Sequence, residues 1–103
     1  MEILKRIFGL GNQIDLAAII TKDTHLVDVR TPAEFAGGHV KGSVNIPLDQ
    51  LQKRLSEFKN KKSIVVFCQS GNRSQQAKTI LEKNNIPNVT NGGSWTTVKQ
   101  FVK

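Results

Sequence analysis

The chain has 103 residues, of which 38% are apolar, so it can bury one modest core and has little room for a second domain. Its net charge is +7, but Phe58 is the only aromatic residue within the densest basic run, so nucleic-acid binding is not expected. A single cysteine permits no internal disulfide, and no apolar run approaches the roughly 20 residues that span a bilayer. We therefore expect a cytoplasmic protein with no nucleic-acid partner and no stable membrane insertion.

The chain is expected to begin with an extension, a short helix and a first strand. Residues 1–13 place apolar side chains at helical spacing, and we treat them as an N-terminal extension of a single domain. Asp15 stands where it can cap a short helix over residues 16–21. Residues 25–29 are rich in aliphatic and β-branched residues, which predicts a strand.

A capped helix, a brief strand and a longer helix are expected next. Thr31 precedes a proline and lies three residues before Glu34, which is the spacing of a capping box. Two glycines at 37–38 end that helix. Residues 44–46 predict a second strand, and apolar residues over 49–58 recur at helical spacing, which predicts a helix.

The second half of the chain predicts the centre of a sheet. Residues 63–67 are the most apolar run and do not alternate with polar residues, as expected of a parallel strand buried on both faces. A helix from Ser74 follows, then a strand at 89–90, a turn at 92–94 and a last helix over 95–101. This alternation predicts an α/β fold, with a central, mostly parallel sheet of about five strands and helices on both faces.

The only cysteine comes directly after the most apolar strand, at the start of a short loop. Ligands of parallel α/β sheets bind beyond the carboxyl ends of the strands, and a loop that leads into a helix can turn several N–H groups inward. Such donors stabilise a thiolate and lower a cysteine pKa from about 8.5. We therefore predict that Cys68 is a nucleophile, although a buried cysteine that only fills space is the alternative. The residues predicted to bind the substrate are Gln69, Ser70, Gly71, Asn72 and Arg73.

Four segments, in order, resemble the rhodanese-like sulfurtransferase family in its single-domain form. They are Leu26–Phe35, Gly38–Leu48, Ile64–Ser74 and Gly92–Trp95, within residues 14–101. The resemblance implies that Cys68 takes a sulfane sulfur from thiosulfate or a persulfide and holds it as a persulfide. It also implies that the sulfur passes to cyanide or to an external thiol, such as that of a protein, without a metal or an organic cofactor.

The loop's neutral residues bear on which sulfur donor is used, and its length bears on whether the enzyme could instead be a phosphatase. Many family loops place a basic residue after the cysteine, whereas Gln69, Ser70 and Asn72 are neutral, so thiosulfate is expected to be a poor donor and a persulfide a better one. Related phosphatases use a longer Cys-x5-Arg loop, and the Cys-x4-Arg spacing here disfavours a phosphatase or arsenate-reductase-like enzyme. The other alternative is a non-catalytic interaction module of the same fold, against which the intact loop argues.

Other residues are expected to support the loop. Asp28 and Arg30 fall on the same face of a strand end, where they form an ion pair that organises the next turn or, by resemblance, help to orient the loop. Ser74 begins the helix after the loop. By family analogy His39 lies near the pocket and holds a loop carbonyl, and we expect Trp95 to close the core or the pocket wall.

Overall fold

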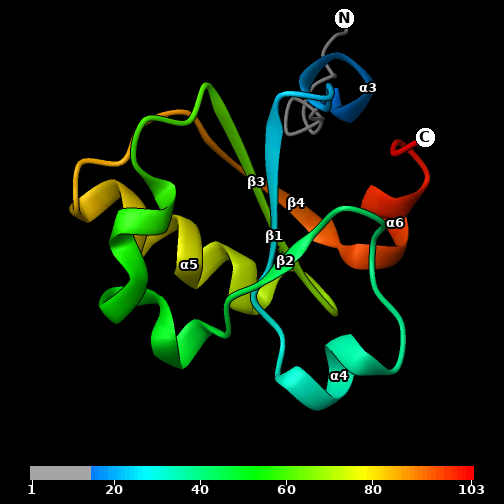
Figure 1. Cartoon of the computed structure of the whole chain (residues 1–103), viewed down its shortest axis with the longest axis horizontal. Helices are drawn as coiled ribbons and strands as arrows, with labels where there is room; N and C mark the ends of the chain where they lie inside the picture. The colour runs from blue at the N-terminus through cyan, green and yellow to red at the C-terminus, as the bar shows by residue number, and fades with distance from the viewer. Residues whose placement is uncertain (1–14) are drawn as a thin grey trace, which may run out of the picture.

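A parallel sheet forms the centre of the structure, a computed structural model that describes residues 15–103. The strands are β1 (Thr24–Asp28), β2 (Val44–Asn45), β3 (Ser63–Cys68) and β4 (Val89–Ser94), in the spatial order β2-β1-β3-β4 (Figure 1). Every neighbouring pair is parallel, which confirms the predicted fold class. The expected count of about five strands was too high. The described residues form four strands, each at a place where the sequence predicted one individually, so the estimate of about five was one too many. The predicted extension over residues 1–13 lies outside the described residues.

Helices cover both faces of the sheet, as predicted. They are α3 (Leu16–Ile19), α4 (Pro32–Ala36), η1 (Leu48–Phe58), α5 (Asn72–Lys83) and α6 (Trp95–Lys99). Helices η1 and α5 lie against one face, and α3 and α6 lie over the other (Figure 1). Helix α4 follows β1 directly, at the edge of the sheet where the parallel strands end.

Side chains along β3 alternate between two hydrophobic cores. Ile64, Val66 and Cys68 belong to the core under η1 and α5, whereas Val65 and Phe67 belong to the core under α3 and α6. All five are at most 1% exposed, so the strand is buried on both faces as its composition predicted. The alternation also explains why the Cys68 side chain lies on the α5 face of the sheet.

The predicted helix caps are present. Asp15 accepts a hydrogen bond from the N–H of Ala18 at 3.3 Å, and the helix that follows ends at Ile19. The Thr31 hydroxyl accepts from the N–H of Glu34 at 3.2 Å, while the Glu34 carboxylate accepts from the N–H of Thr31 at 2.9 Å. This reciprocal capping box starts α4 immediately after β1 and fixes the position of the Glu34 carboxylate.

The segment predicted as a helix over 49–58 is a 3₁₀ helix, η1, with a break at Arg54 (φ −121°, ψ 28°). Leu51 and Phe58 are buried, and Leu55 packs partly against the core. A continuous 3₁₀ helix places every third residue on one face. Leu51 and Leu55 are four residues apart and Leu55 and Phe58 are three apart, so the break at Arg54 allows all three to face the core. The sequence therefore predicted the buried face of this segment but not the type of helix.

Residues 92–94, predicted as a turn, are part of β4 instead. Val66 of β3 pairs with Asn91 of β4, but the next residue, Phe67, pairs with Gly93. Gly92 is therefore the extra residue of a β-bulge. At this bulge the chain passes so close to its neighbours that only a residue without a side chain fits. Gly92 thus marks close packing of β4 against β3 and α6.

Gly92→Ala is expected to destabilise the fold, because a Cβ there would lie 2.8 Å from side-chain carbons of Val65 and Val98. Overpacking of this kind costs about 1–3 kcal/mol of the free energy of unfolding, which urea titration would measure. Gly37→Ala is the matched control, because its Cβ would meet only carbonyl oxygens, at 3.5 Å or more. Val98→Ala should cost less in the Gly92→Ala background than alone. Equal stability of the two glycine variants would contradict this packing.

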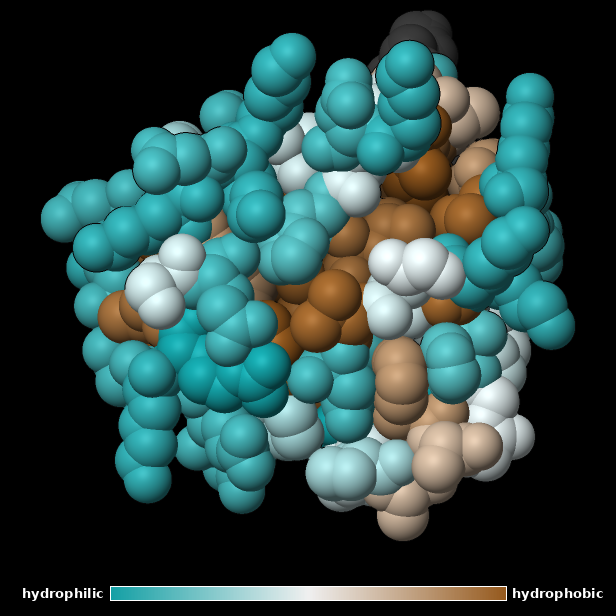
Figure 2. All heavy atoms as spheres, in the orientation of Figure 1, coloured by the Kyte–Doolittle hydropathy of each residue, from teal (hydrophilic) through white to brown (hydrophobic). Residues whose placement is uncertain are grey.

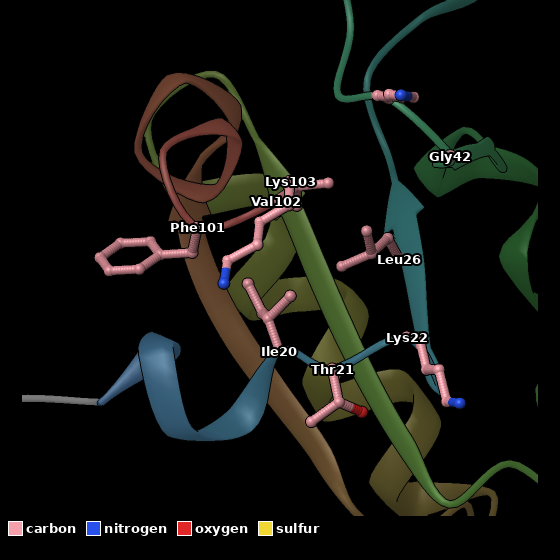
Figure 3. A pocket seen from close by; sticks show the side chains of 9 residues that line it. Ile20, Thr21, Lys22, Leu26, Gly42, Phe101, Val102 and Lys103 are labelled. Carbon is pink, nitrogen blue, oxygen red and sulfur yellow. The ribbon is translucent and has the colours of Figure 1, made fainter.

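The surface is mainly hydrophilic on the face shown in Figure 2, with hydrophobic atoms gathered near its middle. A hollow of about 440 Å³ lies between the end of α3, β1 and the C-terminal segment, and its lining includes Ile20, Leu26 and Val102 (Figure 3). The loop after β3 contributes no residue to this hollow. None of the helices within residues 15–103 has both the length and the apolar character needed to cross a membrane.

Candidate active site

Cys68 is the last residue of β3 and therefore lies at the carboxyl edge of the sheet. Its side chain is 1% exposed. Helix α5 starts at Asn72, so only Gln69, Ser70 and Gly71 connect the strand to the helix. This short connection brings the first turn of α5 against the sulfur, on the face of the sheet that Cys68 already occupies.

Hydrogen-bond donors converge on the Cys68 sulfur. The N–H of Gly71 donates to Sγ at 3.0 Å, and the N–H of Ser74 donates at 3.4 Å. The Ser74 hydroxyl oxygen lies 3.5 Å from Sγ. Gly71 has φ +101°, a left-handed conformation that glycine adopts readily and that turns its N–H back toward the strand. The loop thus forms a cradle whose donors meet at one sulfur atom.

These contacts lower the pKa of Cys68. Burial of the sulfur raises the pKa, but hydrogen bonds from the Ser74 hydroxyl and from the N–H groups of Ser74, Gly71 and Ser70 together lower it by more. The donors favour the thiolate because a hydrogen bond to the charged form stabilises that form. Since the thiolate is the nucleophilic form of cysteine, the site increases the reactive fraction of Cys68 near neutral pH.

Ser74→Ala is expected to raise the pKa of Cys68, because it removes the hydroxyl beside Sγ and leaves the N–H in place. A hydrogen bond to a charged group contributes roughly 1.5 kcal/mol or more, which corresponds to about one pKa unit. The pH dependence of alkylation by iodoacetamide measures the change, and alkylation below the pKa should slow about tenfold. Thr79→Ala, at an exposed position of the same helix, is the control. An unchanged midpoint in Ser74→Ala would show that the hydroxyl does not stabilise the thiolate.

Arg73 forms a bidentate ion pair with Glu34 of α4. Its two terminal nitrogens donate to the two carboxylate oxygens at 2.7 Å and 3.0 Å. Hydrogen bonds from Arg73 and from the N–H of Thr31 lower the pKa of Glu34 to about 2, so the carboxylate is charged at neutral pH. The guanidinium predicted to bind an anionic substrate therefore ties the start of α5 to α4, with its charge balanced by a neighbour.

Gln69 is held on the other side of the loop by Trp95 of α6. The indole N–H donates to the Gln69 side-chain oxygen at 3.2 Å. The opposite end of the indole lies close to Gly38, where a Cβ would approach Trp95 to 3.3 Å, and the Arg30 guanidinium lies 4.6 Å from the ring centroid. Trp95 is thus a wall between the loop and the end of β1, in agreement with the expectation that it closes the core or the pocket.

Asp28 and Arg30 form a buried ion pair at the end of β1. The Arg30 side chain donates to both Asp28 carboxylate oxygens, at 2.7 to 3.0 Å, and also to the carbonyl of Gly38 at 2.7 Å. Within residues 15–103 the Asp28 carboxylate accepts hydrogen bonds from Arg30 alone, so it organises the turn after β1, and it acts on Arg73 only through space. His39 is exposed, and its Nδ1 lies 2.8 Å from the carbonyl of Phe35 rather than of a loop residue.

Comparison with known proteins identifies the family of this chain. The model of the family described as Rhodanese-like domain matches residues 13–97, which is most of the chain. The chain belongs to the rhodanese-like family. The matched range includes β1 through the start of α6, and with them the cradle around Cys68.

Relatives within the rhodanese-like family include proteins named as sulfurtransferases. PspE of Escherichia coli, named a thiosulfate sulfurtransferase, is 37% identical over 71 residues, which cover 67% of this chain and 68% of PspE. YqhL of Bacillus subtilis is 41% identical over 70 residues, which cover 68% of this chain but only 56% of YqhL. A solved rhodanese from E. coli, described with anions, has a TM-score of 0.66 at 34% identity and covers 72% of this chain and 89% of its own. These likenesses place the chain among sulfurtransferase relatives.

One residue near the cradle of this rhodanese-like domain was not predicted. Asn91 of β4 accepts the Ser74 hydroxyl at 2.6 Å and therefore lies one hydrogen bond away from the sulfur. A polar residue in the last strand, directly before the glycine pair, was the only signal available in the sequence. The described part of the chain brings together no group of three or more His, Cys, Asp or Glu side chains that would suit a metal ion.

Proposed function

We propose that this rhodanese-like domain is a sulfurtransferase in which Cys68 carries one sulfane sulfur, as a persulfide, from a donor to an external acceptor. The convergence of N–H donors from Gly71 and Ser74 on the sulfur of the only cysteine carries this proposal. These donors stabilise the thiolate that attacks, and they stabilise it again when it is the leaving group in the second half of the cycle.

The cycle consists of two displacements at sulfur. The Cys68 thiolate attacks the outer sulfur of the donor, and in thiosulfate the S–S bond breaks with its electron pair leaving on sulfite. An acceptor thiolate then attacks the outer sulfur of the persulfide, the bond to Cys68 breaks, and Cys68 returns as a thiolate. Charge and electron count balance in both steps without an external oxidant. Because Cys68 is the only cysteine in these 103 residues, the acceptor thiol belongs to another molecule or to chain beyond them.

We further propose that persulfides are better donors than thiosulfate. Arg73 is the only charged residue of the loop, and its guanidinium is paired with Glu34. The Gln69 side chain is neutral and is occupied by Trp95. The dianion thiosulfate therefore meets little net positive charge at the cradle, whereas a persulfide with a lower charge does not need it.

A panel of sulfur donors tests the proposed function. The protein is incubated separately with thiosulfate, cysteine persulfide and inorganic polysulfide, and its intact mass is measured. Persulfidation should add about 32 Da, the mass of one sulfur atom, and dithiothreitol or cyanide should remove it. Loading should be faster with cysteine persulfide than with thiosulfate. If no donor adds sulfur to a folded protein, the domain is a non-catalytic interaction module and the proposal is wrong.

Glu34→Gln is expected to improve loading from thiosulfate. Glutamine can keep the capping box with Thr31, but it leaves the Arg73 guanidinium without a balancing charge. A partly exposed pair of this kind contributes up to about 1 kcal/mol, so the loading rate should rise by up to about fivefold at low ionic strength. The gain should shrink in about 0.5 M salt and should be smaller for cysteine persulfide, whose net charge is lower than that of thiosulfate. A rate that stays the same at low salt would show that Arg73 plays no part in attracting the donor.

A further inference from the structure

Asn91 lies beside the cradle although it belongs to a different strand from Cys68. It pairs with Val66 of β3, whose side chain is on the same face of the sheet as Cys68. The bulge at Gly92 begins directly after it, so Asn91 is the last residue of β4 in regular register with β3. Its side chain thus points toward the first turn of α5, as its contacts with Ser74 and Gln75 show.

The Asn91 amide uses its full hydrogen-bonding capacity. Its oxygen accepts from the Ser74 hydroxyl at 2.6 Å and from the N–H of Gly93 at 2.9 Å. Its nitrogen donates to the carbonyl of Gly71 at 3.2 Å and to the side-chain oxygen of Gln75 at 3.2 Å. A backbone N–H can only donate and a backbone carbonyl can only accept, so the orientation of the amide is unambiguous.

This orientation determines what the Ser74 hydroxyl can do. A hydroxyl has one proton to donate, and the amide oxygen of Asn91 can only accept, so that proton lies between Ser74 and Asn91. The Ser74 oxygen is then free only to accept from the thiol of Cys68, 3.5 Å away. To stabilise a sulfur anion, the hydroxyl must rotate its proton from Asn91 to Sγ. Asn91 and the sulfur anion therefore compete for one proton.

We propose that Asn91 is a positioning residue that limits the reactivity of Cys68 by competing with the sulfur anion for the hydroxyl proton of Ser74. The inference rests on the proposed role of Cys68 as the nucleophile. In the resting thiol the proton stays on the short bond to Asn91, and the thiol donates to Ser74. When the thiolate forms, the hydroxyl turns toward it, and the Asn91 oxygen keeps only the Gly93 N–H. The same amide holds the loop through Gly71, so the loop keeps its shape in both states.

Asn91→Ala separates this role from a merely structural one. If Asn91 only holds the loop, its loss should loosen the cradle and raise the pKa of Cys68. If Asn91 competes for the proton, its loss frees the hydroxyl for the sulfur anion, and the pKa should fall by about one unit, the scale of one hydrogen bond to a charged group. Arg73 also interacts with the Cys68 sulfur through space, and this interaction is unchanged in the variant.

The experiment is a double-mutant cycle read out by the pH dependence of alkylation by iodoacetamide. The variants are Asn91→Ala, Ser74→Ala and the double variant, with Gln75→Ala as the matched control. Gln75 also bonds to the Asn91 amide, but its side chain makes no hydrogen bond to the Ser74 hydroxyl, so its variant should leave the pKa of Cys68 unchanged. Asn91→Ala should lower the pKa only while Ser74 is present. Above the pKa its alkylation should be about threefold slower, because nucleophilicity falls with thiol basicity.

A pKa that rises in Asn91→Ala, or that falls equally with and without Ser74, would overturn the inference. Asn91→Leu, which keeps the shape of the side chain and removes the amide, provides the same test if the alanine variant does not fold. Alkylation requires no sulfur donor, so its outcome is independent of whether the domain transfers sulfur. Loading by cysteine persulfide, measured by mass on the same variants, then tests the proposed function separately.

Discussion

A Cys68→Ser variant is expected to gain no sulfur from any donor that loads the unmodified chain. The substitution changes one atom, and Gly71 and Ser74 remain in place to donate to the new oxygen. A serine hydroxyl nevertheless has a far higher pKa than a thiol, and the cradle's N–H groups and hydroxyl are not bases that could remove its proton, so it is not a nucleophile toward sulfane sulfur. Intact mass after incubation with cysteine persulfide should show no added sulfur. In a separate assay with a sulfur donor and cyanide, thiocyanate should form only at the uncatalysed rate.

The control for this variant lies on the same helix but away from the cradle. Thr79→Ala removes a hydroxyl that bonds only to the carbonyl of Gln75, and it should load at the rate of the unmodified chain. Both proteins should unfold at similar urea concentrations, which would show that the loss in Cys68→Ser is chemical. Sulfur that remains bound to a folded Cys68→Ser variant after desalting would mean that the sulfur is carried elsewhere.

The parts of the fold that the sequence predicted well are those determined by neighbouring residues. The capping box joins Thr31 and Glu34, three residues apart, and both of its hydrogen bonds are formed. The apolar run over 63–67 needed only its composition to predict a strand buried on both faces. The bulge at Gly92 could not be predicted in this way, because its cause is the approach of Val65 and Val98 from other elements.

The site shows the same division between local and distant determinants. Position and spacing predicted that the loop after β3 forms a cradle around Cys68, because strand, turn and helix are contiguous there. The partner of Arg73 is 39 residues away in the chain, and the partner of Ser74 is 17 residues away. Such pairs depend on how helices and strands are placed in three dimensions, which periodicity does not determine. The sequence could therefore predict that Arg73 binds an anion, but only the fold shows that its guanidinium is paired with Glu34.

The two flanks of the loop are held by different elements, so the three-residue connection is fixed at both ends. Arg73 ties one flank to α4 through Glu34, and Gln69 ties the other to α6 through Trp95. Neither bond involves the sulfur, so each can be weakened without removing a donor from the cradle. The donors that stabilise the thiolate are backbone N–H groups and one hydroxyl, which makes their geometry depend on the shape of the loop.

Asp28→Ala is expected to cause the largest loss of stability among the variants considered. Asp28 is 0% exposed and Arg30 is 3% exposed, so removing the carboxylate leaves a buried guanidinium without a counter-charge. Breaking a buried pair in this way costs about 3–5 kcal/mol of the free energy of unfolding, out of a total of roughly 5–15 kcal/mol for a domain. Urea unfolding at pH 7 measures the loss directly.

The exposed pair between Arg54 and Glu57 is the natural control for the buried one. Its side chains are 33% and 40% exposed, so Glu57→Ala should cost less than about 1 kcal/mol. Replacing both buried partners, with Asp28→Leu and Arg30→Met, should recover much of the loss, because no charge is then left unpaired. Recovery should be incomplete, since Arg30 also bonds to the carbonyl of Gly38 and lies against the Trp95 ring. If Asp28→Ala costs no more than Glu57→Ala, solvent reaches the end of β1 and the pair does not hold the wall of the site.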